Sequence, residues 1–193
     1  KLDCKSKPEH ERMTEDQLNA EALACIAGTK AQWSAYTTDA AARDTELVRR
    51  AFGYGAVNVW GGSYGTRLGQ AYARLYPASV RSLVLDGVAA PDQVIQAGAR
   101  DAHAALDKMF AQCAADAGCK KAFPNLRAEF DGLVARLEAG PIRVSMPNPR
   151  TAQPLDVTMT AGRFLSTVHG VLYSPADARR LPFLIHNAAQ GRW

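Results

Sequence analysis

Ser63 lies at the centre of a Gly-x-Ser-x-Gly motif, Gly61 to Gly65, and is the residue best placed for nucleophilic chemistry. A β-branched run, Val57 to Val59, precedes the motif, and a helical pattern begins directly after it. This order of strand, sharp turn and helix is the context of a nucleophile elbow. A serine in such a turn has a strained backbone and presents its hydroxyl at the amino end of a helix, where developing negative charge is favoured.

The neighbours of Ser63 have predicted roles of their own. Gly61 and Gly65 are expected to relieve crowding two residues on either side of the serine. The backbone N–H of Tyr64 is predicted to form half of an oxyanion hole. The competing interpretation is that Gly-Gly-Ser-Tyr-Gly is a flexible turn between a strand and a helix. The flanking strand and helix favour the catalytic interpretation.

Bulk composition narrows the function classes. The 193 residues have room for one domain, or for one domain with a sizeable insertion, and 47% hydrophobic with 22% charged residues is ordinary for a globular protein. The net charge of +4 is mild and the arginines are spread along the chain, so we expect no nucleic-acid partner. No apolar run is long enough to predict a membrane span.

The four cysteines fall into two sequence-local sets, Cys4 with Cys25 and Cys113 with Cys119. This arrangement favours two disulfides and an oxidising compartment, and hence a secreted or periplasmic protein. Free buried thiols are the alternative, and four cysteines allow three connectivities. No histidine stands at zinc-ligand spacing from either set, so we expect no metal and no cofactor. The opening residues resemble neither an initiator methionine nor a signal peptide, which suggests the interior of a longer precursor.

Ser63 is expected to sit in a parallel βαβ unit. Asp39 is a plausible cap for a helix whose apolar face would carry Leu47, Val48 and Ala51. Ser63 and Asp86 both fall at the carboxyl ends of strands, where ligands bind in such sheets. Asp86 is interpreted as structural, and a position near a substrate amine is its functional alternative. The predicted elements of this region are a helix over 40–52, a strand over 56–60, a helix to 76 and a strand over 80–85.

Helical patterns dominate on either side of this unit. A helix capped by Thr14 and ending near Gly28 would place Leu18, Ala22 and Cys25 or Ile26 on one face. The chain before it, over 1–13, reads as irregular. We therefore predict an α/β fold with a partial core over 1–91 and a mostly helical second domain over 92–193. The predicted elements of this second domain are helices over 92–117, 123–137, 160–173 and 175–189, with a hairpin over 141–160.

Two segments around the motif closely resemble the α/β-hydrolase fold. They are Val-Asn-Val-Trp-Gly-Gly-Ser-Tyr-Gly-Thr-Arg-Leu and, after it, Tyr-Pro-x-x-Val-Arg-Ser-Leu-Val-Leu-Asp-Gly-Val. Within that fold, the chain is similar to serine exopeptidases of the prolyl aminopeptidase and tripeptidyl aminopeptidase-like group. The resemblance is most specific from Tyr36 to Pro91, and the region after Cys113 looks like the start of the group's helical cap. It implies that Ser63 attacks a peptide carbonyl, that the Tyr64 amide stabilises the oxyanion, and that peptides enter under the cap.

The resemblance also has departures. The family order is Ser, then Asp, then His on later strands, whereas only the predicted cap follows Asp86 here. His103, His169 and His186 lie in helical patterns, where surface or core roles are more usual than a catalytic base. No Gly-rich segment for a second oxyanion donor precedes the elbow. We therefore expect an internal piece of a larger hydrolase that is inactive alone.

Three functions compete on these residues. The first is a serine aminopeptidase that acts on peptides. The second is an esterase or lipase of the same fold, because the elbow uses the same acyl chemistry for both bonds. The third is a non-catalytic binding or assembly module derived from the hydrolase. A two-stranded parallel sheet would expose its edges, so the remainder of the hydrolase chain or a second copy is the expected partner.

Overall fold

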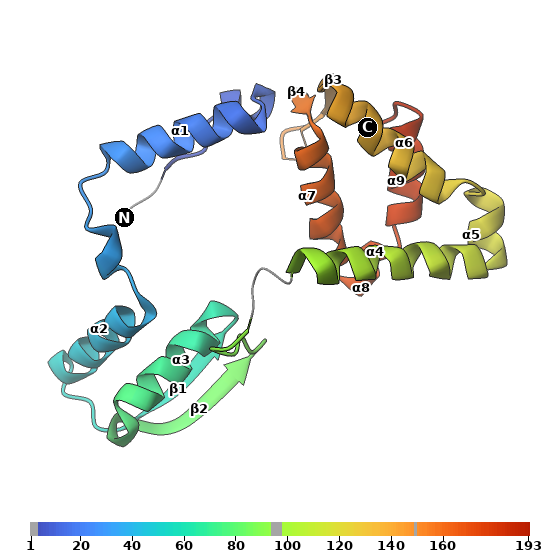
Figure 1. Ribbon diagram of the computed structural model, residues 1–193. Helices are drawn as coiled ribbons and strands as arrows, with labels where there is room; N and C mark the ends of the chain where they lie inside the picture. The colour runs from blue at the N-terminus through green and yellow to red at the C-terminus, as the bar shows by residue number, and fades with distance from the viewer. Residues whose placement is uncertain (1–3, 94–97, 149) are drawn as a thin grey trace. The chain divides into compact units, whose positions relative to one another are not determined.

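The computed structural model describes residues 4–93, 98–148 and 150–193 (Figure 1). Within these residues there are two compact units. The elbow unit comprises residues 30–93, and the helical unit combines residues 4–29 with the chain after residue 97. The predicted division at residue 91 lies close to this boundary. The chain up to Thr29, however, groups with the helical unit and not with the core to which the sequence assigned it.

The elbow unit has the predicted parallel βαβ arrangement (Figure 1). The two strands pair in parallel, with Val59 opposite Leu83 and Gly62 opposite Asp86. Its elements are α2 (Thr38–Ala51), β1 (Val57–Gly62), α3 (Tyr64–Leu75) and β2 (Val80–Asp86), with short 3₁₀ turns at Trp33–Ala35 and Pro77–Ser79.

Helix α3 covers one face of this strand pair. Gly69 allows the close approach, since a Cβ there would lie 3.1 Å from Leu83 Cδ1 and 3.6 Å from Val59 Cγ1. On the opposite face, the register partners Trp60 and Val84 are 68% and 54% exposed. Within the described residues, the sheet is therefore covered on one side and open on the other.

Helix α2 packs on α3 through a face that the sequence did not predict. Leu47 and Val48 were expected to point inward, but they are 62% and 57% exposed. The buried residues of α2 are Ala42 and Glu46. The small Ala42 lets the two helices approach closely, and the helix cap is Thr37, whose hydroxyl accepts the Ala40 N–H, and not Asp39.

The helical unit has a core of its own in which helices pack against one face of an antiparallel hairpin. The predicted hairpin over 141–160 is observed, and Val144 and Val157 are buried register partners on its inner face. Its elements are a 3₁₀ turn at Pro8–Arg12, α1 (Glu15–Gly28), α4 (Gly98–Ala115), α5 (Ala117–Ala122), α6 (Leu126–Ala139), β3 (Ile142–Pro147), β4 (Pro154–Met159), α7 (Ala161–Leu172), α8 (Pro175–Ala178) and α9 (Leu181–Ala189).

Three predictions about these helices need correction. The helix expected over 175–189 is two helices, α8 and α9, because Pro182 lacks an amide hydrogen and starts a new helix at its first turn. The apolar face predicted for α1 is not buried, and Ile26 is 45% exposed. The helix expected over 92–117 does not include Asp92, which lies in a turn, or Gln93; it is described from Gly98 to Ala115, and the predicted position of Ile95 lies outside the described residues.

Polar contacts explain why the N-terminal residues belong to the helical unit. The Arg163 guanidinium on α7 forms an ion pair with Glu11 and donates a hydrogen bond to the His10 carbonyl at 3.1 Å. The Thr160 hydroxyl, at the start of α7, bonds the Glu15 carboxylate. Thr158 Oγ1 on β4 donates to the Arg12 carbonyl at 2.6 Å. Because these contacts involve charged and hydroxyl groups, the apolar pattern of α1 gave no sign of them.

Candidate functional site

Ser63 occupies the sharp turn between β1 and α3. Its backbone has φ 51° and ψ −121°, and its side chain is exposed. Positive φ is uncommon for a residue with a Cβ, and such strain persists only where the surroundings over-determine it. The strand before and the helix after hold the turn, so the serine hydroxyl is presented at the amino end of α3.

The two glycines of the motif differ in what they permit. A Cβ on Gly61 would lie 2.3 Å from the Gly65 carbonyl oxygen and 2.5 Å from the Gly65 carbonyl carbon. A Cβ on Gly65 would meet nothing within 4 Å among the described residues. The expected crowding is therefore real at Gly61, and Gly65 contributes its backbone to that contact. A methyl group therefore fits at Gly65 within the described chain, and the expected crowding by a bulky side chain there stays a prediction.

Thr66 braces the turn, and sequence reasoning missed it. The Ser63 carbonyl accepts the Thr66 amide at 2.9 Å and the Thr66 hydroxyl at 2.7 Å. The same hydroxyl accepts the Ala89 amide at 2.8 Å, and the Thr66 side chain is fully buried. The Ser63 amide donates to the Asp86 carbonyl at 2.9 Å. Threonine hydroxyls often bond a carbonyl three or four residues earlier, so the spacing of Thr66 from Ser63 is the signal that could have revealed this role.

The amide of Tyr64 is the first of helix α3. The first amides of a helix have no intrahelical acceptor, and the helix dipole adds partial positive charge there. The Tyr64 hydroxyl lies 3.0 Å from Thr38 Oγ1 at the start of α2. The Tyr64 ring is therefore tied to α2, while its backbone N–H is placed beside the serine that precedes it.

A buried charged network joins the three elements that flank the elbow. Glu46 on α2 accepts hydrogen bonds from Arg49 Nη2 at 2.7 Å and from the Tyr72 hydroxyl of α3 at 2.9 Å. The Arg49 guanidinium also donates to the carbonyls of Tyr54 and Gly55, which lead into β1. The hydrogen bonds from Arg49 lower the pKa of Glu46 to about 2, against the opposing effect of burial. This network fixes α2, α3 and the entrance to β1 together.

All four histidines lie outside the elbow unit in the sequence. His10 contacts Glu21 at 2.9 Å, and His186 contacts Glu129 at 2.9 Å while its ring packs edge-on to Phe123. His103 forms an exposed pair with Asp107, and His169 lies against Tyr173. Each histidine is thus engaged within the helical unit. The structure does not bring a histidine and Ser63 together within one unit.

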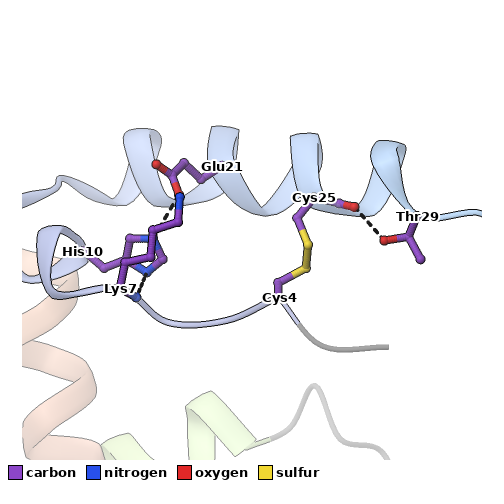
Figure 2. Close-up of a disulfide and its surroundings, with 6 residues drawn as sticks. All are labelled: Cys4, Lys7, His10, Glu21, Cys25 and Thr29. Atoms are coloured by element: carbon purple, nitrogen blue, oxygen red, sulfur yellow. Dashed lines mark hydrogen bonds and ion pairs between the residues drawn. A yellow bond between two sulfur atoms is a disulfide. The ribbon is translucent and has the colours of Figure 1, made fainter. Parts of the chain in front are cut away.

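Both sequence-local cysteine pairs form disulfides. Cys4 and Cys25 link the irregular N-terminal segment to α1, beside the group formed by Lys7, His10 and Glu21 (Figure 2). Cys113 and Cys119 connect the end of α4 to α5. These are the connectivities that the spacing favoured.

The described residues contain no group of three or more His, Cys, Asp or Glu side chains arranged to hold a metal ion. None of the described helices combines the length and the apolar character needed to cross a bilayer.

The helical unit contains an apolar cavity of about 780 Å³ between the hairpin, α7 and α9. Buried Leu181 and Ile185 of α9 form part of its wall, and Trp193 also lines it. Arg163 and Glu11 add one ion pair to the lining. A space of this size and character suits apolar side chains.

The elbow unit has three features of α/β-hydrolases: a parallel strand pair, a strained serine at the carboxyl end of the first strand, and a helix that begins at that serine. Residues 6–160 match the family model described as alpha/beta hydrolase fold, and the chain belongs to this family. The described fold is a partial α/β-hydrolase with a large helical portion.

Individual relatives agree with this membership. The chain is 35% identical over 119 residues to serine protease Hip1 of Mycobacterium tuberculosis, covering 58% of this chain and 22% of that protein. It is 44% identical over 57 residues to a tripeptidyl aminopeptidase of Streptomyces lividans, covering 30% of this chain and 11% of the relative. A putative hydrolase of Escherichia coli, YuaR, is 30% identical over 140 residues, covering 67% of this chain and 28% of the relative. The chain thus spans a minor part of each relative's length.

Proposed function

We propose that this chain is the nucleophile-bearing part of a serine peptidase that releases amino-terminal residues or short peptides. The observation that carries the proposal is the exposed Ser63 held at φ 51° between β1 and α3. Relatives named serine protease and tripeptidyl aminopeptidase support peptides as the substrate class. The two disulfides support a secreted or periplasmic location.

In the proposed reaction, Ser63 Oγ attacks the carbonyl carbon of the scissile peptide bond, and a general base takes the hydroxyl proton. The carbonyl oxygen becomes an oxyanion that the Tyr64 amide stabilises. Collapse of this intermediate breaks the C–N bond, the amine leaves with a proton, and an acyl-serine is formed. Water then hydrolyses the acyl-serine to the free acid and Ser63.

The base of this reaction is proposed to come from a part of the hydrolase outside these 193 residues. The elbow unit has no histidine in its sequence, and the relatives are several times longer than the aligned region. Without its base, a triad serine loses most of its reactivity. We therefore propose that the 193-residue chain alone has no peptidase activity, and that the rest of the hydrolase covers the open face at Trp60 and Val84.

A non-catalytic module is the second candidate, and the engagement of all four histidines within the helical unit favours it. The test is hydrolysis by the full-length protein of matched substrates, a tripeptide p-nitroanilide and the p-nitrophenyl ester of the same tripeptide. The peptidase proposal predicts cleavage of the anilide that is lost in Ser63→Ala and retained in Ser34→Ala. Cleavage of the ester alone would favour an esterase, and cleavage of neither would favour the non-catalytic module.

A further inference from the structure

A second, polar pocket lies within the elbow unit, beside α3. Its volume is about 410 Å³. Arg67, Gln70 and Arg74 line it from α3, and their spacing of three and four residues places them on one face of that helix. Thr38 and Asp39 contribute from the start of α2. We call this cavity the arginine pocket.

The arginine pocket carries an excess of positive charge. Asp39 is its one carboxylate, and it pairs with Arg74 at 2.7 Å. Within the described residues, Arg67 has no carboxylate partner. Two guanidinium groups and a single carboxylate therefore leave one cation uncompensated, which makes the pocket complementary to an anion.

Arg67 also has an unused hydrogen-bond donor. Its Nη2 donates to the Ala90 carbonyl at 2.6 Å, which fixes the side chain against the loop after β2. Its Nε is buried and has no hydrogen-bond partner among the described residues. A buried donor without an acceptor is costly, and an anion that draws the Arg67 side chain towards the pocket would relieve that cost.

The arginine pocket lies close to the elbow along α3. Arg67 follows Ser63 by four residues, or about one helical turn. Thr38, at the pocket's edge, contacts the Tyr64 hydroxyl at 3.0 Å. A peptide that reached both the arginine pocket and Ser63 would lie along the first turns of α3.

We propose that the arginine pocket binds a carboxylate of a peptide substrate, with Arg67 as the main donor. The proposal rests on the peptidase function above, because only that function supplies a peptide next to Ser63. Arginine suits this role, since its planar fork presents parallel donors to the two oxygens of a carboxylate. Acidic peptides would therefore be preferred over their amide counterparts.

The test is a titration of the ¹⁵N-labelled chain followed by NMR at the Arg67 Nε–H resonance, which reports the orphan donor directly. The probes are N-acetyl-aspartyl amide, N-acetyl-asparaginyl amide and inorganic phosphate, at low ionic strength so that screening is limited. We expect a saturating shift with the aspartyl probe. The affinity for the asparaginyl probe should be at least about tenfold lower. Arg67→Gln should abolish the response of the remaining pocket resonances.

Arg81→Gln is the matched control, because Arg81 lies in the same unit with its Nε already bonded to Asn58 Oδ1 at 2.9 Å. This variant should bind the aspartyl probe like the wild type. Equal responses to the aspartyl and asparaginyl probes, or equal losses in both variants, would overturn the proposal. Phosphate binding tenfold tighter than the aspartyl probe would overturn the assignment to peptides.

Failure of the peptidase function would be distinguishable from failure of this pocket. If the full-length protein cleaves the anilide but the Arg67 Nε–H does not respond, the arginine pocket is rejected and the peptidase stands. If the aspartyl probe binds but the full-length protein cleaves neither substrate, the assignment of the carboxylate to a substrate is rejected.

Discussion

Gly61→Ala should damage the elbow, whereas Gly65→Ala should not. Neither glycine has a positive φ, so alanine is compatible with both backbones and the difference is steric. The new Cβ at position 61 would lie 2.3 Å from the Gly65 carbonyl oxygen and 3.0 Å from the Thr66 amide nitrogen. Both are backbone atoms that cannot rotate away, so the turn itself must shift.

Overpacking a protein interior lowers the free energy of unfolding by about 1–3 kcal/mol. Because the clash in Gly61→Ala is with backbone atoms, we expect a loss at the upper end of this range, about 2–3 kcal/mol. For Gly65→Ala the Cβ enters open space near the start of a helix. Because alanine is the better helix former, we expect no loss and a gain of up to about 1 kcal/mol.

Hydrogen exchange measured by mass spectrometry is the suitable assay, because α6 of the helical unit serves as an internal reference in the same sample. A loss of about 2–3 kcal/mol accelerates exchange through global opening of the elbow unit by roughly 30- to 150-fold in β1 and α3. Gly65→Ala should leave these rates unchanged or slower. Wild-type exchange in Gly61→Ala, or equal acceleration in both variants, would refute the steric reading of the elbow.

Three further predictions follow from the contacts described above. The pKa of Glu46 is lowered to about 2 from 4.5, so its contribution to stability is complete above pH 4.5 and is lost as the pH falls towards 2. In Glu46→Gln, the stability of the elbow unit, measured by circular dichroism during acid unfolding, should depend less on pH over this range. An unchanged pH dependence would contradict the role of the network. Replacing Cys113 and Cys119 by serine should destabilise the helical unit by about 2 kcal/mol, as expected for a disulfide that closes a short loop. Urea unfolding measures this loss, and an unchanged midpoint would contradict the prediction. Replacing Cys4 and Cys25 by serine should speed hydrogen exchange in α1, which buries no residue, while leaving α6 protected; equal loss in both helices would show that α1 supports the core.

Local signals predicted the parts of the structure that depend on neighbouring residues. The run before Gly61 indicated a strand, and Thr14 marked a helix start that the structure shows, with its hydroxyl accepting the Gln17 amide. The alternation over 141–160 gave the hairpin, because strand pairing across a short loop is a local property. The spacing of the cysteines gave both disulfides for the same reason.

What the sequence did not predict depends on contacts between distant residues. The inward face of α2 carries Ala42 and Glu46 because Tyr72, far along the chain, supplies a hydrogen bond there. Apolar periodicity alone favoured Leu47 and Val48. The attachment of the N-terminal residues to α7 is likewise made by Arg163 with Glu11, an ion pair that spans most of the sequence.

At the candidate site, the motif predicted the sharp turn and the strained backbone at Ser63, whereas the bracing hydroxyl of Thr66 is seen only in the structure. The distinction between Gly61 and Gly65 also required the structure, because the motif treats the two glycines as equivalent. The arginine pocket was not predicted, since the sequence shows only that the arginines are spread along the chain, and not that Arg67 and Arg74 line one pocket.

The most direct test of the central claim is reaction of the full-length protein with a fluorophosphonate, followed by peptide mapping of the adduct. The account predicts a single adduct on Ser63, absent in Ser63→Ala and absent from the 193-residue chain, because the base is proposed to lie outside these residues. An adduct on a different serine, or a Ser63 that stays unmodified in the full-length protein, would contradict it.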